Sequence, residues 1–273
     1  MNWTIKVLHF GTITSPKCMF TPGLDTDLVL DAPYLGFLLQ KDGINVLVDT
    51  GINERYIVNG HTRWNNCPAE GGTSWVTEAL KKEGLEPNDI HMVLYTHLHN
   101  DHTGACHLFH DAETVFMKAE WENLLNPLPI QIYRGDFDQT VIEIFRKMKN
   151  VVMLDGDAEL ANGLKVYLTP GHTRGSMCIG VPTDKGPRII VGDLFYMPYF
   201  LFPQTDSMTD MKGKTHPITP LPEAMGPILT HVMIYDQYAY YDSYYKVRAL
   251  APGFEEKYFL FGHDGSLLFT GVR

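Results

Sequence analysis

The seven-residue segment Thr96-His97-Leu98-His99-Asn100-Asp101-His102 constrains this chain more than any other part of its sequence. It follows directly on the apolar segment 90–95, whose composition is typical of a buried strand. His-x-His-x-Asp-His places four metal-competent side chains within six residues, where imidazole nitrogens and a carboxylate oxygen can converge on divalent cations. Composition alone produces such a pattern in only about one chain of this kind in a thousand. The segment therefore predicts a metal-binding loop at the end of a strand.

Three later segments repeat this arrangement, in which a side chain able to bind metal follows an apolar strand pattern. These side chains are His172 after the strand 164–169, Asp193 after the strand 188–192, and His263 after the apolar segment 258–261. Taken singly, such residues are more often caps or surface residues, but their place after a strand and a turn favours ligation. Together the loops supply five histidines and two aspartates, more than one tetrahedral ion uses. We therefore expect two ions that share a bridging carboxylate.

Strand and helix patterns alternate along the chain, which indicates an α/β fold with helices packed on sheets. Strands are predicted at 3–10, 34–40, 44–48, 90–95, 150–154, 164–169, 176–181 and 188–192, and helices at 74–83, 118–126 and 138–148. No internal repeat, low-complexity tract or linker marks a boundary. A single domain spanning residues 1–273 is the expectation.

Residues 195–256 differ from the rest of the chain because they are rich in aromatic residues, Met and Pro. One interpretation is an excursion that faces the substrate. Another is a helix that packs one face on a sheet, made of Ile234, Tyr238, Tyr241 and Tyr245. The two interpretations are compatible, and the apolar segments could also form a homodimer contact.

The charge and cysteine content restrict the partners and the compartment. A net charge of −10 and a pI near 5.6 argue against a nucleic-acid or anionic membrane partner, since both need clustered Lys and Arg. The four cysteines form no Cys-x-x-Cys pair, which favours reduced thiols. The first ten residues lack the pattern of a secretory signal, and no apolar run is long enough to span a membrane. We therefore expect a cytoplasmic protein that acts on a small molecule.

These motifs resemble those of the metallo-β-lactamase-fold hydrolases, whose signature is a strand, Thr-His-x-His-x-Asp-His, and later His, Asp and His at strand ends. The resemblance covers most of the chain. It implies an αββα four-layer sandwich of two mixed β-sheets flanked by helices. It also implies that His97, His99 and His172 hold one ion, that Asp101, His102 and His263 hold the other, and that Asp193 bridges them. Asp49, in the Asp-Thr-Gly turn after 44–48, would orient a ligand histidine.

Individual ligand positions separate the subgroups of this superfamily. Asp193 disfavours a β-lactamase, because those members lack a bridging aspartate, and His99 disfavours the oxygen-reducing diiron members, which carry Glu at that position. The short acidic chain also lacks the basic or nuclease modules of the RNA-processing members. Thioesterases of the glyoxalase II type and quorum-quenching N-acyl-homoserine lactonases remain. The chain resembles the lactonases most, because Tyr196 stands three positions after Asp193 as it does in them, although the stretch from Asp193 to His263 is longer than in the smaller lactonases.

The resemblance thus implies a metal-dependent hydrolase that opens a lactone or related ester with a hydroxide bridging two ions. One ion and the Tyr196 hydroxyl would stabilise the oxyanion, and Asp101 would pass a proton to the leaving alkoxide. Zinc is the expected metal, although the ligands also suit Fe, Co and Mn. The alternatives are a thioesterase that uses the same ions and a protein that binds metal without catalysis.

Overall fold

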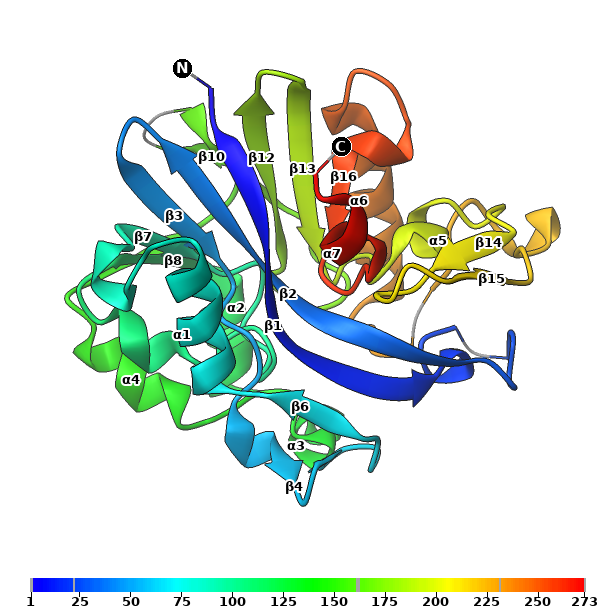
Figure 1. Cartoon of the computed structure of the whole chain (residues 1–273), viewed down its shortest axis with the longest axis horizontal. Helices are drawn as coiled ribbons and strands as arrows, with labels where there is room; N and C mark the ends of the chain where they lie inside the picture. Colours follow the sequence, from blue (N-terminus) through cyan, green and yellow to red (C-terminus); the bar gives the residue numbers. More distant parts are fainter. Residues whose placement is uncertain (1, 22, 161–162, 231, 273) are drawn as a thin grey trace.

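Two β-sheets lie face to face in the computed structural model, and helices cover their outer sides (Figure 1). The structure describes residues 2–21, 23–160, 163–230 and 232–272. The arrangement is the αββα sandwich of the metallo-β-lactamase fold, as the sequence predicts. None of the helices in the described ranges is both long and apolar enough to cross a membrane.

The first sheet has seven strands in the order β6-β1-β2-β3-β7-β8-β9. Their bounds are β1 Thr4–Pro16, β2 Val29–Lys41, β3 Ile44–Val48, β6 Ala69–Gly71, β7 Met92–Leu94, β8 Glu113–Met117 and β9 Asn150–Leu154. The strands β1, β2 and β3 pair antiparallel, whereas β3, β7, β8 and β9 pair parallel. Three outer helices belong to this half of the chain, α1 Thr73–Lys82, α2 Lys118–Leu125 and α4 Val141–Lys147.

The second sheet has five strands in the order β10-β11-β12-β13-β16. Their bounds are β10 Ala158–Glu159, β11 Lys165–Leu168, β12 Met177–Thr183, β13 Gly186–Gly192 and β16 Phe259–Phe261. The strands pair antiparallel except for the last, which adds parallel to β13. Helix α6, Gln237–Leu250, covers the outer side of this sheet (Figure 1).

The apolar residues of the strands divide between two cores according to the alternation of side chains along a strand. In β3, Val46 and Val48 point into the core between the sheets, whereas Leu47 joins the core under the helices. In β13, Ile190 faces the other sheet and Ile189 faces the helix layer. Both faces of each sheet are covered, which explains why these strands read as continuous apolar runs.

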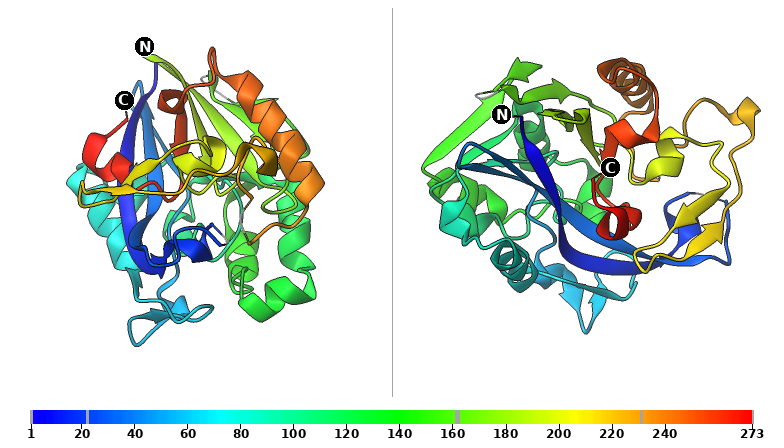
Figure 2. Two further views of the ribbon diagram at one scale, coloured as in Figure 1. Left: turned by 90° about the vertical axis from the view of Figure 1, so that its right-hand side faces the viewer. Right: turned by 45° about the horizontal axis from the view of Figure 1, so that its top comes forward.

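Strand β1 continues beyond the predicted end at residue 10 because Gly11 lets it bend. Gly11 has φ +145°, and a Cβ there would lie 2.3 Å from the carbonyl oxygen of Glu70 in β6. The register between β1 and β2 shifts at this point, and both strands run on as a long hairpin. Its far end lies beside the segment that holds β14 Ser207–Thr209 and β15 Thr215–Pro217 (Figures 1 and 2). Thr219 donates from its backbone N–H and its hydroxyl to Asp25 there.

A helix forms in the expected region but begins at Gln237, so Ile234 lies outside it. The predicted buried face is only partly correct, because Tyr241 packs against the core whereas two of the other predicted tyrosines are exposed. Helix α6 buries Tyr240 and Tyr244, while Tyr238 is 87% exposed and Tyr245 is 60% exposed. Asp236 caps the helix at its N-terminus. The backbone of Tyr240 lies so close to Gly171 that a Cβ on Gly171 would come within 2.6 Å of the Cα of Tyr240. This close approach turns the helix so that Tyr240, rather than its neighbours, enters the core.

The remaining helices are short. They are α3 Pro129–Arg134, α5 Pro198–Leu201 and α7 Ser266–Thr270, none of which the sequence patterns predict.

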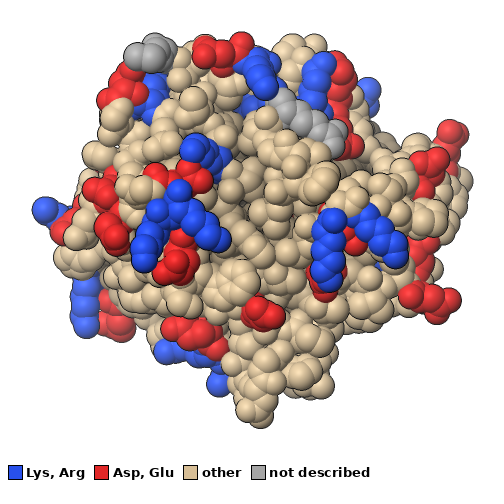
Figure 3. Space-filling view, in the orientation of Figure 1, with Lys and Arg blue, Asp and Glu red and all other residues tan. Residues whose placement is uncertain are grey.

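Figure 3 shows basic and acidic side chains interleaved on the face seen in Figure 1, without a continuous field of either sign.

Candidate metal centre

Four loops, each following a strand, meet at one edge of the sandwich. The loop after β7 carries His97, His99, Asp101 and His102, and the segments after β11, β13 and β16 carry His172, Asp193 and His263. Two groups of ligand-type side chains result, His97 with His99 and His172, and Asp101 with His102, Asp193 and His263. The structure thus brings all seven side chains together, while their role as metal ligands stays a prediction.

The loop after β7 is shaped by close packing against the turn after β3. Thr50 donates its backbone N–H to the carbonyl oxygen of His102 at 2.7 Å, and Gly104 donates to Gly51 at 2.7 Å. A Cβ on Gly104 would lie 2.1 Å from the carbonyl carbon of Ile52, so only glycine fits here. The turn and the loop therefore hold each other in one conformation.

Asp49 in that turn orients two of the histidines. Its carboxylate accepts from the backbone N–H of Thr96 at 2.8 Å, from the Thr96 hydroxyl at 2.7 Å and from Nδ1 of His102 at 2.9 Å. Since the Thr96 hydroxyl proton goes to Asp49, its oxygen can accept from Nδ1 of His97, 3.1 Å away. Both rings are thereby held with the Nε2 lone pair free, the form that binds a metal.

Backbone carbonyl oxygens orient the two histidines that follow strands of the second sheet, because each accepts a hydrogen bond from Nδ1 of the ring. Nδ1 of His172 donates to the carbonyl oxygen of Met233, and Nδ1 of His263 donates to that of Pro33, both at 2.8 Å. In the first group, Nε2 of His172 lies 3.1 Å from Nδ1 of His99, which marks the corner where these rings converge.

The Asp193 carboxylate lies between the two groups. Its Oδ2 is 4.0 Å from Nε2 of His97 and 3.8 Å from Nε2 of His172. Its Oδ1 is 3.3 Å from Nε2 of His102 and 3.2 Å from Nε2 of His263. Oδ2 also lies 3.2 Å from Nε2 of His263, so the carboxylate lies within 4.0 Å of histidines in both groups, as a carboxylate that bridges two cations must.

The chemistry of these side chains fits a pair of divalent cations. Nε2 of His97 and Nε2 of His102 are buried and have no hydrogen-bond partner among the described residues, which is costly unless a cation accepts their lone pairs. Burial, followed by the neighbouring histidines, lowers the pKa of His97 well below its usual value, so this ring stays a neutral ligand. Burial opposes charge on His102, yet Asp193, Asp49 and Asp101 raise its pKa well above the usual value. The carboxylates that stabilise a proton there would stabilise a metal cation equally.

Tyr196 stands over both groups. Its ring lies 5.6 Å from that of His172 and 5.5 Å from that of His263. Burial, together with Asp193 and Asp101, raises the pKa of its hydroxyl well above the usual value, so it stays a hydrogen-bond donor at neutral pH. Asp101 differs from the other ligand-type residues in being partly exposed, with 17% of its side chain accessible. The open side of the cluster is therefore at Asp101.

A cavity of about 190 Å³ opens at this side of the cluster. Its floor includes His99, Asp101, Asp193, Tyr196 and His263, and much of its wall is apolar. Residues of the 195–256 segment contribute to it, namely Tyr196, Val232 and Met233, as the substrate-facing interpretation of that segment requires.

Glu120 on α2 was not predicted from the sequence. It is fully buried and accepts backbone N–H groups from Leu98, at 3.0 Å, and from Gly175, at 2.9 Å. Its carboxylate therefore joins the loop that carries His97 and His99 to the loop that carries His172. A glutamate in an amphipathic helix gives no signal of this role, because both partners are distant in sequence.

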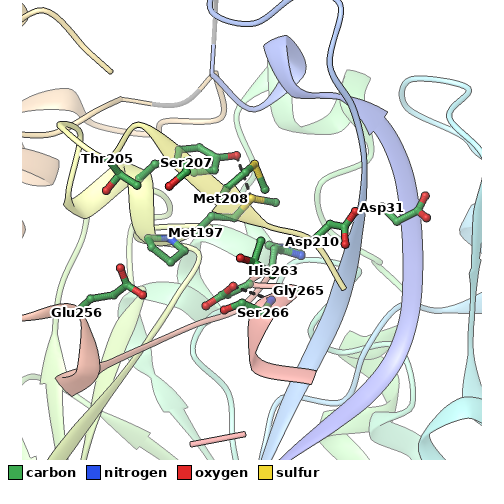
Figure 4. Close-up of a pocket in the computed structure, with 14 residues that line it drawn as sticks. Asp31, Met197, Thr205, Ser207, Met208, Asp210, Glu256, His263, Gly265 and Ser266 are labelled. Carbon is green, nitrogen blue, oxygen red and sulfur yellow. Dashed lines mark hydrogen bonds between the residues drawn. The ribbon is translucent and has the colours of Figure 1, made fainter. Parts of the chain in front are cut away.

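A second cavity borders His263 from another direction (Figure 4). Three of its four acidic residues have partners within the protein: Asp31 pairs with Lys212 at 2.6 Å, Asp210 pairs with His216 at 2.8 Å, and Asp264 accepts the backbone N–H of Ser266 at 2.9 Å. We therefore assign no ligand to this cavity, and the chemistry concentrates at the first.

Comparison with known proteins identifies the family of the chain. The family model of the metallo-beta-lactamase superfamily matches residues 35–221, which include six of the seven ligand-type residues, all but His263. The chain belongs to the metallo-beta-lactamase superfamily. Within that superfamily it is similar to an N-acyl homoserine lactonase of a Bacillus species, with 28% identity over 210 residues, 71% of this chain and 77% of that protein. An N-acyl homoserine lactonase of Bacillus thuringiensis is 26% identical over 200 residues, 69% of this chain and 75% of that protein.

Solved structures of the superfamily share the fold of this chain. One is an N-acyl homoserine lactone hydrolase with the product N-hexanoyl-L-homoserine at its catalytic metal centre. It has a TM-score of 0.71 and 20% identity, and the match covers 97% of this chain and 94% of that one. Another is a dizinc quorum-quenching lactonase, with a TM-score of 0.69 and 18% identity over 96% of this chain and 87% of that one.

Proposed function

We propose that this protein is a dinuclear-metal hydrolase that opens the ring of a lactone, an N-acyl homoserine lactone or a related compound. The observation that carries the proposal is the position of Tyr196. Its ring packs against one histidine from each ligand group, and it lines the same cavity as Asp101 and Asp193. The names of the Bacillus relatives give the same substrate class. We take residues 1–273 as one domain in which the 195–256 segment forms part of the pocket.

Under this proposal, His97, His99 and His172 would hold one cation, Asp101, His102 and His263 would hold the other, and Asp193 would bind both. Zinc is the metal we favour, since imidazole and carboxylate ligands suit it. Two bound divalent cations would lower the pKa of a water molecule and polarise the ester carbonyl.

The protein's own groups then handle charge and protons. The Tyr196 hydroxyl, which its raised pKa keeps protonated, donates a hydrogen bond to the oxygen that becomes negative as the carbonyl is attacked. The Asp101 carboxylate lies at the open side of the cluster, where it can take the proton of the attacking water and pass it to the leaving alkoxide. The ester bond breaks, and a hydroxy acid results.

Hydrolysis of a panel of lactones, acyl thioesters and β-lactams, with metal content measured on the same sample, tests the function. Turnover of lactones in preference to the other two classes is the expected result. Preferential turnover of thioesters would instead assign the protein to the glyoxalase II type, the alternative function with the same ligands. Metal binding without turnover of any class would refute both.

The Tyr196→Phe variant tests the role of the hydroxyl. Loss of one oxyanion donor is expected to lower kcat about 100-fold, with metal content unchanged. Tyr199→Phe is the matched control, because the hydroxyl of Tyr199 is buried against the sulfur of Met197 and does not line this cavity. An unchanged rate in Tyr196→Phe would remove Tyr196 from the mechanism.

A further inference from the structure

Arg134 is the one arginine or lysine, in the part of the chain that the structure describes, that lines the cavity above the ligand cluster. Its guanidinium is clamped by Asp136, with Nε 3.0 Å from Oδ1 and Nη2 2.6 Å from Oδ2. The Asp136 side chain is 2% exposed and that of Arg134 is 29% exposed. Both residues line the cavity, and the arginine is the more exposed of the two.

The loop after β7, which carries His99 and Asp101, holds the backbone next to Arg134 in place. Asn100, which lies between His99 and Asp101, donates from Nδ2 to the carbonyl oxygen of Gly135 at 2.8 Å. Its backbone N–H donates to the carbonyl oxygen of Asp136 at 2.8 Å. The guanidinium consequently holds a set position relative to the ligand cluster, as a specificity group must.

The guanidinium of Arg134 has more N–H donors than its pairing with Asp136 uses. It carries five N–H groups, and two of them point at Asp136. Within the described residues its side chain has no other hydrogen-bond acceptor, so three N–H groups remain for a ligand. Arg134 and Tyr196 line the same cavity, so those donors share it with the hydroxyl proposed to face the reacting carbonyl.

The charge of the pair selects the kind of acceptor. Asp136 offsets the positive charge of Arg134, so a second carboxylate in the cavity gains little, whereas an uncharged carbonyl oxygen gains a charge-assisted hydrogen bond. The rest of the wall is largely apolar and includes Met19, Phe20, Trp64, Val232 and Met233. The cavity thus brings together the ligand cluster, a guanidinium that can donate to a carbonyl oxygen, and an apolar wall.

We propose that Arg134, held by Asp136, donates to an uncharged carbonyl oxygen on the substituent of the lactone ring and makes the enzyme prefer acylated lactones to plain alkyl lactones. This inference rests on the proposed lactonase function and adds a specificity-determining residue to it.

The test compares Arg134→Met with the wild type on two substrates of equal carbon count, N-hexanoyl homoserine lactone and γ-decalactone. Loss of a hydrogen bond from a charged donor is expected to lower kcat/KM for the acylated lactone about 10- to 100-fold, mainly through KM. The value for γ-decalactone should change less than about threefold. Arg146→Met is the matched control, since Arg146 lies on α4, pairs with Glu143 and does not line the cavity.

A second variant controls for the destabilisation that Arg134→Met causes by leaving the buried carboxylate of Asp136 without its partner. Arg134→Met combined with Asp136→Asn removes both charges and should show the same substrate-selective loss with full metal content. An equal loss on both lactones would overturn the inference and make Arg134 a structural residue. If the wild type with full metal content opens neither lactone, the proposed function fails, and the inference falls with it. Turnover by the wild type therefore separates the two failures.

Discussion

Glu120→Gln tests whether one buried carboxylate sets the geometry of a single metal position. Glu120 accepts the backbone N–H groups of Leu98 and Gly175, so it joins the two loops that bear His97, His99 and His172. Glutamine keeps one acceptor oxygen but turns an amide NH₂ toward the other N–H. A buried N–H that loses its acceptor costs about 1–3 kcal/mol. If this cost displaces the two loops relative to each other, the affinity of the three-histidine position falls about 5- to 150-fold.

The assay is a titration of metal-depleted protein with Co²⁺ or Zn²⁺ in competition with a chelator, which resolves two binding constants. The expected outcome is one weakened constant and one close to that of the wild type, because Asp101, His102 and His263 have no contact with Glu120. Glu122→Gln on the same helix is the control, since that side chain is 46% exposed. Equal weakening of both positions, together with a lower Tm, would show that Glu120 merely stabilises the fold. Two unchanged constants would refute the reasoning altogether.

Three further changes probe the centre and its supports. Asp193→Ala should lose bound metal at both positions as well as activity, because the carboxylate lies between the two groups; metal analysis of the purified variant checks this. Asp25→Asn should destabilise the fold by about 3 kcal/mol, because it leaves the ammonium group of Lys17 buried without its 2.7 Å partner. Against the effect of burial, Lys17 and Thr219 lower the pKa of Asp25. The pair therefore stabilises the fold above the ordinary carboxyl pKa, and the difference between wild type and variant in urea unfolding should shrink as the pH falls below about 4. Gly104→Ala should cost about 3 kcal/mol or more in the same assay, since the added Cβ meets backbone at 2.1 Å.

For each of these predictions, one measurable outcome would contradict the reasoning. Full metal content in Asp193→Ala would mean that the carboxylate does not bridge. A constant deficit of Asp25→Asn from pH 7 to pH 3 would mean that the ion pair is not its source. Wild-type stability in Gly104→Ala would mean that the loop after β7 can move away from the turn after β3.

The ligand cluster could be predicted because its signal is local. Each ligand-type residue follows an apolar strand by one to a few positions, and the strand direction alone sends it to the edge of the sheet. Only two residues separate the end of β7 from the segment 97–102, so no knowledge of tertiary contacts is needed to place four of the seven side chains at one point.

The parts that were missed depend on contacts between distant segments. The buried face of α6 is set by the approach of Tyr240 to Gly171, a contact that periodicity cannot reveal. Strand β8 is only five residues long and was not distinguished from its surroundings. Glu120 contacts residues far along the chain, and the proposed role of Arg134 depends on a cavity that exists only in the folded state, so the sequence around either residue does not indicate its role.

The division of the centre between the two sheets has a consequence for the order of events during synthesis. The loop after β7 supplies four side chains, but His172, Asp193 and His263 come from the second sheet. A nascent chain that has released only its first 150 residues from the ribosome cannot complete either group, because each group needs a residue that is still to be translated. The first group would be complete once His172 has emerged and the second only once His263 has emerged, so under the proposed assignment the uptake of both cations would follow the pairing of the two sheets.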